Sequence, residues 1–492
     1  MLRAPSTLAI AIGCALGVQA SWSVAAEWTT TAAVAPRVVY SDNVCLNDQN
    51  EQDEIYGVIT PSFGIEGKGN RANVSLLASV DASTLSDGDL RDNGCSNARG
   101  DLDRDDYLPD VRARADATLV DQWLYLDVRG TATQNDVNPF VAGGDDVADR
   151  RGNVNTTYRY TVSPYIKRRL KDVADVTLRY TYDDQTNSKD SVSDSTEESA
   201  NLLISSGPSA SPISWGLQGD YSNVEFDETD TRQFDDESEL KSAQLNLGYQ
   251  ITRQWQVNGY YGEEWNDFVS DRDDIDGDYW SAGLTWTPNE RATFSAGTGD
   301  RFFGTTPYFR ADYRHKRSRF TVNYEQTLTY SRNVRTLGVD DGLGGQPTSL
   351  TDSPILDERV TLGYRFTGRR FNFGVTGNYS DQTREGSNGF VGSEFDIDEA
   401  RYTGVLVNAD RSLAQNLTAR VAMGWREEEP KGEGSNFIAE SETWRVGLGL
   451  DRDFTDRFTA SVQYDYIDRQ SDISLDEYQE NRITFSVRID LL

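Results

Sequence analysis

The sequence predicts an all-β fold: a transmembrane antiparallel up-and-down β-barrel of about 22 strands, within a range of about 18 to 22. Three observations support this prediction. Apolar and polar residues alternate along many short segments, no segment has the apolar period of a helix, and short turns alternate with long acidic loops. Such asymmetry is typical of outer-membrane barrels, whose short turns are periplasmic and whose long loops are extracellular.

The C-terminal segment, residues 481–492, is the clearest strand. One face carries Ile483, Phe485, Val487, Ile489 and Leu491, and the residues between them are polar. Alternation of this kind predicts a strand with one apolar face. Because no apolar helix is available to cover that face, we expect it to contact lipid while the polar face lines a lumen. This strand would close the barrel, and it is similar to the signal that outer-membrane assembly machinery reads. The usual terminal aromatic residue is replaced by Leu492.

Residues 1–26 have the pattern of a secretory signal peptide. Arg3 supplies the positive start, residues 8–18 form a short apolar run, and Val24-Ala25-Ala26 offers a cleavage site. The sequence therefore predicts a barrel over residues 27–492. A lipoprotein motif at Cys14 is a weaker alternative. Cleavage removes one positive charge and takes the net charge from −32 to −33.

Alternating segments follow one another as hairpins along the chain. The first short turn is Gly67-Lys68-Gly69-Asn70, and Gly and Asn are residues that tight hairpin turns favour. Further short turns are expected at residues 120–122, 168–172, 252–254, 288–290, 368–370 and 453–456. Long acidic loops are expected at residues 135–153, 183–198, 227–239, 271–277, 332–357 and 427–440. The short turns are often basic, notably residues 314–319.

The cysteines indicate one disulfide. Cys14 belongs to the signal peptide, which leaves Cys45 and Cys95. Both lie in polar segments, residues 42–54 and 86–107, which are the first two long loops on the same side of the barrel. An even number of cysteines in an exported protein permits pairing. We predict a Cys45–Cys95 bridge.

Composition and charge exclude several classes of protein. A mean hydropathy of −0.62 excludes a bundle of membrane helices but not a barrel, since half of each barrel strand is polar. Aromatic residues make up 11% of the chain, as expected for girdles at two membrane interfaces. The acidic balance excludes nucleic-acid binding through phosphate neutralisation. A soluble antiparallel β protein stays open as an alternative, but no helix signal is present to build a soluble layer over the apolar stripes. A propeller also stays open, and the export signal and the C-terminal strand argue against it.

Chemistry-bearing motifs are few. His315 is the only histidine, so a Ser–His pair and a histidine-containing zinc cluster are unavailable. Residues 271–278 depart from a calcium loop at Arg272 and at Gly283. We expect no enzyme, no cofactor and no metal site. Paired carboxylates for glycoside cleavage stay open, because sequence does not give their separation.

If the apolar rows face lipid, the opposite rows line the lumen. The candidate lumen-lining arginines are Arg112, Arg114, Arg129, Arg159, Arg179, Arg365, Arg420, Arg445 and Arg488. Aspartates including Asp127, Asp451 and Asp465 share these rows. Two interpretations are open. The charges form cross-strand ladders that rigidify the wall, or the arginines form a basic track for an anionic sugar polymer. Tyr125 could stack on a sugar ring or belong to an interfacial girdle.

Several motifs carry a family resemblance. The motifs are Glu27-Trp28, Tyr40-Ser41-Asp42-Asn43-Val44, Thr60-Pro61, residues 316–324 and, later in the chain, Gly368-Arg369-Arg370. The chain resembles the PEP-CTERM/exosortase-associated outer-membrane β-barrel proteins of exopolysaccharide systems. The resemblance implies a barrel encoded beside polysaccharide export genes. It supplies no catalytic residues.

The function expected from the sequence is an outer-membrane pore for exopolysaccharide or small hydrophilic solutes. Outer-membrane lipid, lipopolysaccharide and the assembly machinery are the expected partners, with polysaccharide and export proteins as further ones. The alternative is a structural or adhesive barrel with a closed lumen, whose acidic loops bind lipopolysaccharide or surface polymer. A polymer-trimming hydrolase is a third possibility. A TonB-dependent receptor is not expected, because strands begin almost at the mature N-terminus and leave no room for a plug domain.

Overall fold

A computed structural model describes residues 26–49, 51–85, 107–136, 140, 154–189, 192–207, 210–227, 236–270, 272–334, 354–386, 399–431 and 440–492. The predicted signal peptide therefore lies outside the described residues, apart from Ala26. The first strand starts at Glu27, the residue that follows the predicted cleavage site.

Antiparallel strands make up nearly all of the described chain. The first half contains β1 (Glu27–Ser41), β2 (Glu54–Lys68), β3 (Ala72–Leu85), β4 (Tyr107–Val120), β5 (Leu124–Asp136), β6 (Val154–Leu170), β7 (Ala174–Asn187), β8 (Ser195–Ser206), β9 (Ile213–Phe226), β10 (Asp236–Gln250) and β11 (Trp255–Asp267). The second half contains β12 (Gly277–Asn289), β13 (Ala292–Arg301), β14 (Gly304–Thr305), β15 (Tyr308–His315), β16 (Ser318–Tyr330), β17 (Pro354–Thr367), β18 (Phe371–Arg384), β19 (Glu399–Ala414), β20 (Leu417–Lys431), β21 (Ser441–Thr455), β22 (Phe458–Ser471) and β23 (Tyr478–Asp490). Two single helical turns, α3 (Ser331–Val334) and η2 (Ser474–Asp476), complete the described elements.

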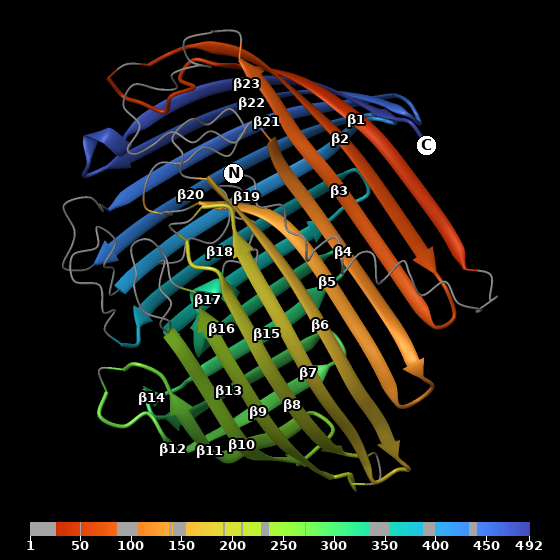
Figure 1. Cartoon of the computed structure of the whole chain (residues 1–492), viewed down its shortest axis with the longest axis vertical. Helices are drawn as coiled ribbons and strands as arrows, with labels where there is room; N and C mark the ends of the chain where they lie inside the picture. Colours follow the sequence, from red (N-terminus) through yellow and green to blue (C-terminus); the bar gives the residue numbers. More distant parts are fainter. Residues whose placement is uncertain are drawn as a thin grey trace.

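The sheet closes on itself because the first strand pairs with the last. Each wall strand pairs with its neighbour in the chain, and β1 pairs with β23 through partners such as Val34 with Ile489 and Tyr40 with Ile483. Figure 1 shows these two strands side by side. The two-residue β14 lies in a loop, and the other strands form a closed 22-stranded barrel. The predicted fold class is confirmed.

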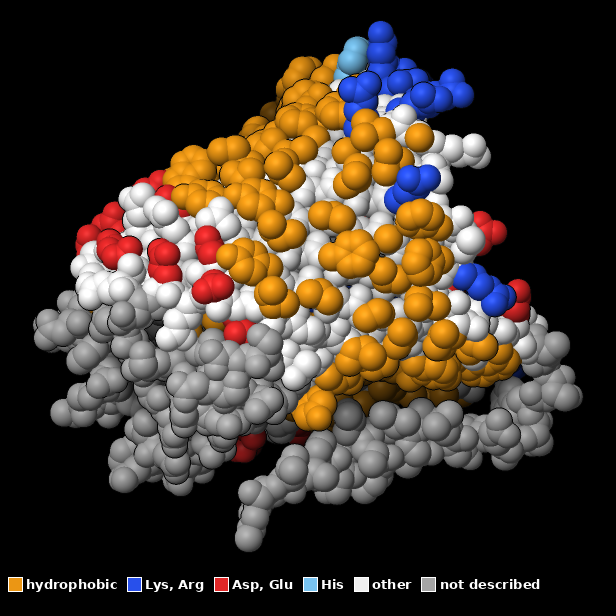
Figure 2. All heavy atoms as spheres, turned by 90° about the horizontal axis from the view of Figure 1, so that it is seen from above, with side chains coloured by type: hydrophobic (Ala, Val, Ile, Leu, Met, Phe, Trp, Pro, Cys, Tyr) orange, Lys and Arg blue, Asp and Glu red, His pale blue; other side chains and the backbone are white. Residues whose placement is uncertain are grey.

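Side-chain direction alternates along each strand, as pleating requires. On β23, Ile483, Phe485 and Ile489 are exposed on the outer surface. On the face seen in Figure 2, apolar side chains form a broad band, with basic side chains at one end and acidic side chains toward the other. A continuous exposed apolar band of this kind is the surface that a barrel presents to lipid. The polar residues between the apolar ones face the interior.

The two ends of the barrel differ as the sequence predicts. One end carries short turns, such as those that join β4 to β5 and β15 to β16, where Gln122 and Lys316 adopt positive φ angles of 62° and 52°. Basic side chains surround His315 at this end, as Figure 2 shows. The opposite end carries the long loops. By the usual orientation of such barrels, the short turns are periplasmic.

Several strands extend further into the long-loop end than the sequence pattern predicts. Residues 183–187, 236–239 and 427–431 are strand rather than loop. These segments lie beyond the apolar band, where the outer face no longer contacts lipid. Alternation of apolar and polar residues is therefore not required there, and the sequence pattern misses the strand. Among the described residues, no helix is long and apolar enough to span a membrane.

The disulfide prediction is open to a direct test. Cys45 is disulfide-bonded and lies buried beside Val44 and Tyr56, whereas Cys95 lies outside the described residues. We expect non-reducing peptide mapping of outer-membrane protein to recover one cross-linked peptide joining Cys45 to Cys95. Free Cys95 thiol in the same digest would contradict the pairing. Cys95→Ser should leave Cys45 alkylatable, which is the control.

Candidate functional site in the lumen

The inner wall holds the candidate arginines in two groups. Arg112 and Arg114 lie on β4, Arg129 on β5, Arg159 on β6 and Arg179 on β7, so these neighbouring strands form one basic region of the wall. The others are spread over distant strands: Arg365 on β17, Arg420 on β20, Arg445 on β21 and Arg488 on β23. This clustering follows from the predicted up-and-down order, in which consecutive strands of the chain are neighbours in the wall.

Most of these arginines have carboxylate partners. Arg159 Nε bonds both carboxylate oxygens of Asp183 at 2.8 Å, and Arg179 Nη1 bonds Asp127 Oδ2 at 2.8 Å. The remaining pairs are Arg112–Asp110, Arg420–Asp451, Arg445–Asp465 and Arg488–Asp490. Four of the six pairs join different strands and fit the ladder interpretation, in which cross-strand charge pairs stiffen the wall, whereas Arg112–Asp110 and Arg488–Asp490 each lie within one strand.

Arg114, Arg129 and Arg365 are different. Within the described part of the chain, none of the three has a carboxylate within 4.0 Å, and all three side chains are exposed to the lumen. The inner wall therefore holds both kinds of arginine: some pair with carboxylates, and others have guanidinium groups that are open to solute.

Across the lumen, the inner face of β19–β22 is hollowed. The hollow has a volume of about 480 Å³. Gly424, Gly447 and Gly449 line part of it, and Arg420 and Arg445 lie at its edge. Glycines at inward positions leave space that larger side chains would fill. This wall therefore offers room for a solute in contact with charged groups.

Described residues of three long loops make contacts across the extracellular end of the barrel. The first of these loops begins with α3, directly after β16, and its residues contact β7 in a distant part of the wall. Arg332 pairs with Asp183, and Asn333 Oδ1 accepts a hydrogen bond from Arg159 Nη2 at 3.1 Å. The Arg332 side chain is 1% exposed. Asp183 is therefore shared by a wall arginine and a loop arginine.

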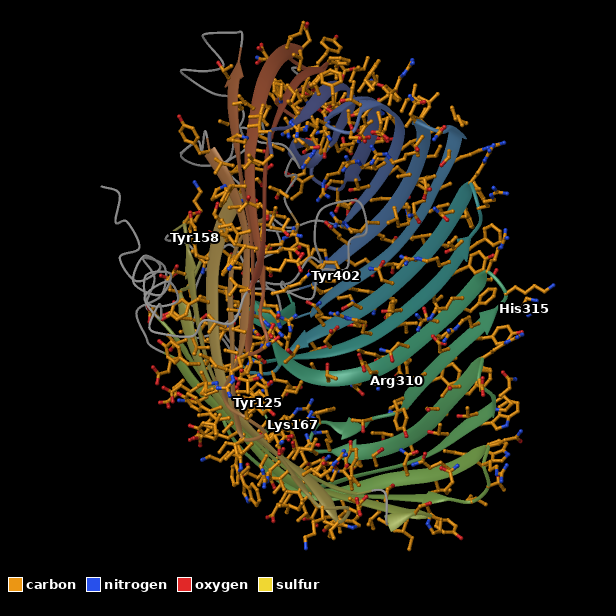
Figure 3. The ribbon with its side chains drawn as sticks, turned by 90° about the vertical axis from the view of Figure 1, so that its right-hand side faces the viewer. Tyr125, Tyr158, Lys167, Arg310, His315 and Tyr402 are labelled. Atoms are coloured by element: carbon orange, nitrogen blue, oxygen red, sulfur yellow. The ribbon has the colours of Figure 1, made fainter. Side chains whose placement is uncertain are left out.

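The β5–β6 loop crosses to the opposite wall through Phe140. The ring of Phe140 is buried and stacks on Tyr402 of β19, with centroids 5.7 Å apart. The Phe140 carbonyl accepts a hydrogen bond from Arg469 Nη2 of β22 at 3.0 Å. Arg469 also pairs with buried Glu428 at 3.4 Å. Figure 3 shows Tyr402 on the inner side of its wall.

The third crossing joins the β11–β12 loop to the β18–β19 loop. Arg272 makes two hydrogen bonds to Glu385, at 2.7 and 2.9 Å. Gly386 has φ of +109°, and a Cβ there would come within 2.0 Å of the Val269 carbonyl oxygen. Only glycine suits both the angle and the close approach. Together, these contacts tie loop residues to distant parts of the wall at the extracellular end.

The alternation of apolar and polar residues does not identify these loop anchors. Phe140 gave one signal, because it is the single aromatic residue in the polar segment 137–153. A large apolar ring in such a loop needs a burial site. Arg332 gave no comparable signal, since its partner Asp183 is remote in sequence and was expected in a loop of its own.

The other sequence motifs lie away from the lumen. His315 is exposed on the β15–β16 turn. In the acidic segment that resembles a calcium loop, Asp274 Oδ1 and Asp276 Oδ1 accept backbone N–H bonds from Asp276 and Asn266. These are the bonds of an ordinary polar turn.

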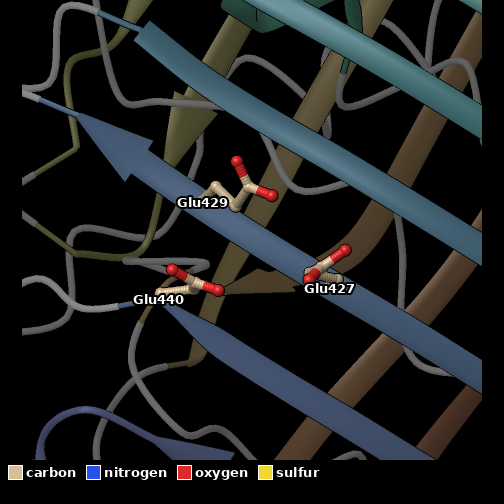
Figure 4. A group of neighbouring side chains, drawn as sticks. All are labelled: Glu427, Glu429 and Glu440. Atoms are coloured by element: carbon tan, nitrogen blue, oxygen red, sulfur yellow. The ribbon is translucent and has the colours of Figure 1, made fainter.

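The outer surface carries aromatic residues capped by carboxylates at the extracellular edge of the apolar band. Trp425 and Trp444 both donate from Nε1 to Glu442 Oε1, at 2.7 and 2.8 Å, and Tyr324 and Tyr379 donate to Glu358 and Asp381. Near the two tryptophans, Glu427, Glu429 and Glu440 bring carboxylate oxygens within 4.8 Å of one another (Figure 4). This belt lies where an outer-leaflet headgroup would contact the barrel.

Comparison with solved structures finds barrels of the same architecture. The FrpB iron transporter of Neisseria meningitidis matches in its F3-3 variant with a TM-score of 0.56 at 9% identity, over 94% of this chain and 81% of that one. Its F5-1 variant gives a TM-score of 0.52 at 9% identity, with coverages of 94% and 82%. A mutant ferric enterobactin receptor of Pseudomonas aeruginosa gives 0.50 at 10% identity, with coverages of 94% and 81%.

No protein-family model and no curated protein matches the chain. At 9–10% identity, the structural likeness shows the fold and not the cargo. The closed barrel, its apolar outer band and its likeness to Gram-negative receptors place the chain in the bacterial outer membrane. The chain is an outer-membrane β-barrel with a polar, charged lumen.

Proposed function

We propose that this barrel is an outer-membrane pore that passes a hydrophilic polymer, such as exopolysaccharide, or small hydrophilic solutes. The observation that carries the proposal is the inner wall. Guanidinium, carboxylate and amide groups line it from one end to the other, and Arg114, Arg129 and Arg365 are open to solute. Such groups exchange hydrogen bonds with a hydrated solute at little cost.

The loop residues at the extracellular end would control the access of a solute to the lumen. Phe140 and Arg332 anchor residues of two loops to distant parts of the wall. Passage of a polymer chain would require these anchoring contacts to break. These contacts across the extracellular end also favour a second candidate, a structural barrel whose lumen stays closed.

Planar-bilayer recording separates the two candidates. We expect refolded protein to give a small, steady single-channel conductance, and we expect added oligosaccharide to block that current in a concentration-dependent way. Heat-modifiable migration on gels verifies that the barrel is folded. Folded, inserted protein without conductance, with the loops intact and after their anchors are removed, would leave the structural barrel as the function.

The outer belt supports lipopolysaccharide as a partner. Arg401 bonds both Asp381 and Glu429 on the outer surface, and Lys431 pairs with Glu399 nearby. Cations and carboxylates at this height match the phosphates and bridging divalent cations of the outer leaflet. The assembly machinery would act on β23, the strand that closes the barrel.

A further inference from the structure

We propose that the inner wall of β4–β7 holds a subsite for a uronate residue, the carboxylate-bearing pyranose of an anionic polysaccharide. The proposal rests on the pore function above and names its substrate class. It begins with Arg114 of β4 and Arg129 of β5, which are directly opposite each other in the register. Like charges placed in this way destabilise a sheet unless an anion compensates them.

The nearby carboxylates are engaged elsewhere. Asp116 and Asp127 form the next inward pair along the same strands. Asp116 Oδ2 accepts from Asn73 Nδ2, and Asp127 Oδ2 accepts from Arg179 Nη1, both at 2.8 Å. Within the described chain, neither aspartate lies within 4.0 Å of a guanidinium nitrogen of Arg114 or Arg129.

The neighbouring carboxylate in the row is also engaged. Thr161 is the partner of Arg129 on β6, and Thr161 Oγ1 donates to Asp183 Oδ2 at 2.6 Å. Asp183 already holds Arg159 and the loop residue Arg332. The two exposed guanidinium groups are therefore accessible to an anion from solution. They are an exception in a chain whose net charge is −32. Planar guanidinium groups bind carboxylates in a bidentate manner.

An aromatic platform lies toward the periplasmic end of the same wall. Tyr125 and Tyr165 are cross-strand partners on β5 and β6, and their rings stack with centroids 5.0 Å apart and an interplanar angle of 16°. Arg179 Cζ lies 4.0 Å from the centroid of the Tyr165 ring. Lys167 projects from the same face two residues beyond Tyr165, and Figure 3 shows Tyr125 and Lys167 close together on this wall.

The spacing suits a short oligosaccharide. Arg129 lies four positions beyond Tyr125, which is about 13 Å along an extended strand. A sugar chain lying along the wall can place a C–H face on the tyrosines while a carboxylate reaches the arginine pair. Neutral sugars would gain only the first contact. The arrangement therefore selects an acidic sugar over a neutral one of equal length.

Isothermal titration calorimetry tests the subsite on the folded barrel in detergent, independently of conductance. The probes are trigalacturonate and the neutral trisaccharide maltotriose. We expect trigalacturonate to bind more tightly than maltotriose. The double change Arg114→Gln with Arg129→Gln should weaken it roughly tenfold or more, the effect of losing a charge-assisted contact.

Two matched variants keep the test specific. Arg310→Gln with Arg319→Gln removes the same charge from β15 and β16, where both arginines already pair with carboxylates, and should leave trigalacturonate binding within a factor of about two. Tyr125→Leu removes part of the platform without changing charge and should weaken binding even if the arginine variant fails to fold. Equal affinity for both sugars, or equal loss in both double variants, would overturn the subsite. Binding without conductance would instead refute the pore and leave the subsite standing.

Discussion

Replacing Arg332 and Phe140 by alanine is expected to raise the single-channel conductance of the barrel several-fold. Arg332 holds the β16–β17 loop to Asp183, and Phe140 holds the β5–β6 loop to Tyr402. The change leaves no buried charge alone, because Asp183 keeps its bonds to Arg159 and Thr161. Loops that lose such anchors open more often, since their local stability falls. Planar-bilayer recording of the double variant measures the effect.

The control applies the same chemical changes at the periplasmic end. Arg169 pairs with Asp175 near the β6–β7 turn, and Phe454 is exposed on the outer surface near the β21–β22 turn. Arg169→Ala with Phe454→Ala should leave conductance close to that of the wild type. If the two double variants behave alike, the extracellular loops do not limit the current.

A charge placed on the lipid face is expected to damage the barrel far more than the same charge placed one residue along. Val462 of β22 is 46% exposed in the apolar outer band, and Gln463 faces the lumen, where its amide bonds Asp465. Val462→Arg should lower the free energy of unfolding by about 2–4 kcal/mol, the cost of arginine near the bilayer midplane. Urea titration of protein folded in lipid vesicles gives this quantity.

Gln463→Arg is the matched control, because it introduces the same side chain on the other face of the same strand. A lumen position gives the guanidinium water and the Asp465 carboxylate, so stability should change little. Equal destabilisation by the two variants would show that the apolar band does not face lipid. Stabilities are compared at one lipid composition, since bilayer thickness affects the cost.

The sequence predicted the wall of the barrel well for a physical reason. Lipid on one side and water on the other impose an alternation of period two. Residues such as Ile483, Phe485 and Ile489 therefore identify the last strand and its lipid-facing side, and that strand closes the barrel. Short turns rich in Gly, Asn or basic residues then divide the chain into hairpins. Beyond the membrane this constraint ends, and the strand extensions at residues 183–187 and 427–431 were missed.

The candidate site was predictable only in part. Alternation showed that Arg114 and Arg129 share the lumen face, but their direct pairing depends on register, which the β4–β5 turn fixes. The loop anchors could not be predicted from the sequence, because Arg332 contacts Asp183 and Phe140 contacts Tyr402 across large sequence separations. Such contacts follow from closure of the barrel and from loop packing, neither of which leaves a local pattern.

Single-channel recording of the refolded wild type beside the Arg332→Ala, Phe140→Ala variant tests the central claim most directly. A polar lumen narrowed by its own loops predicts a small, steady wild-type current and a several-fold larger current in the variant. No current from either protein, when gel mobility shows both to be folded, would contradict the claim that the lumen is a route across the membrane.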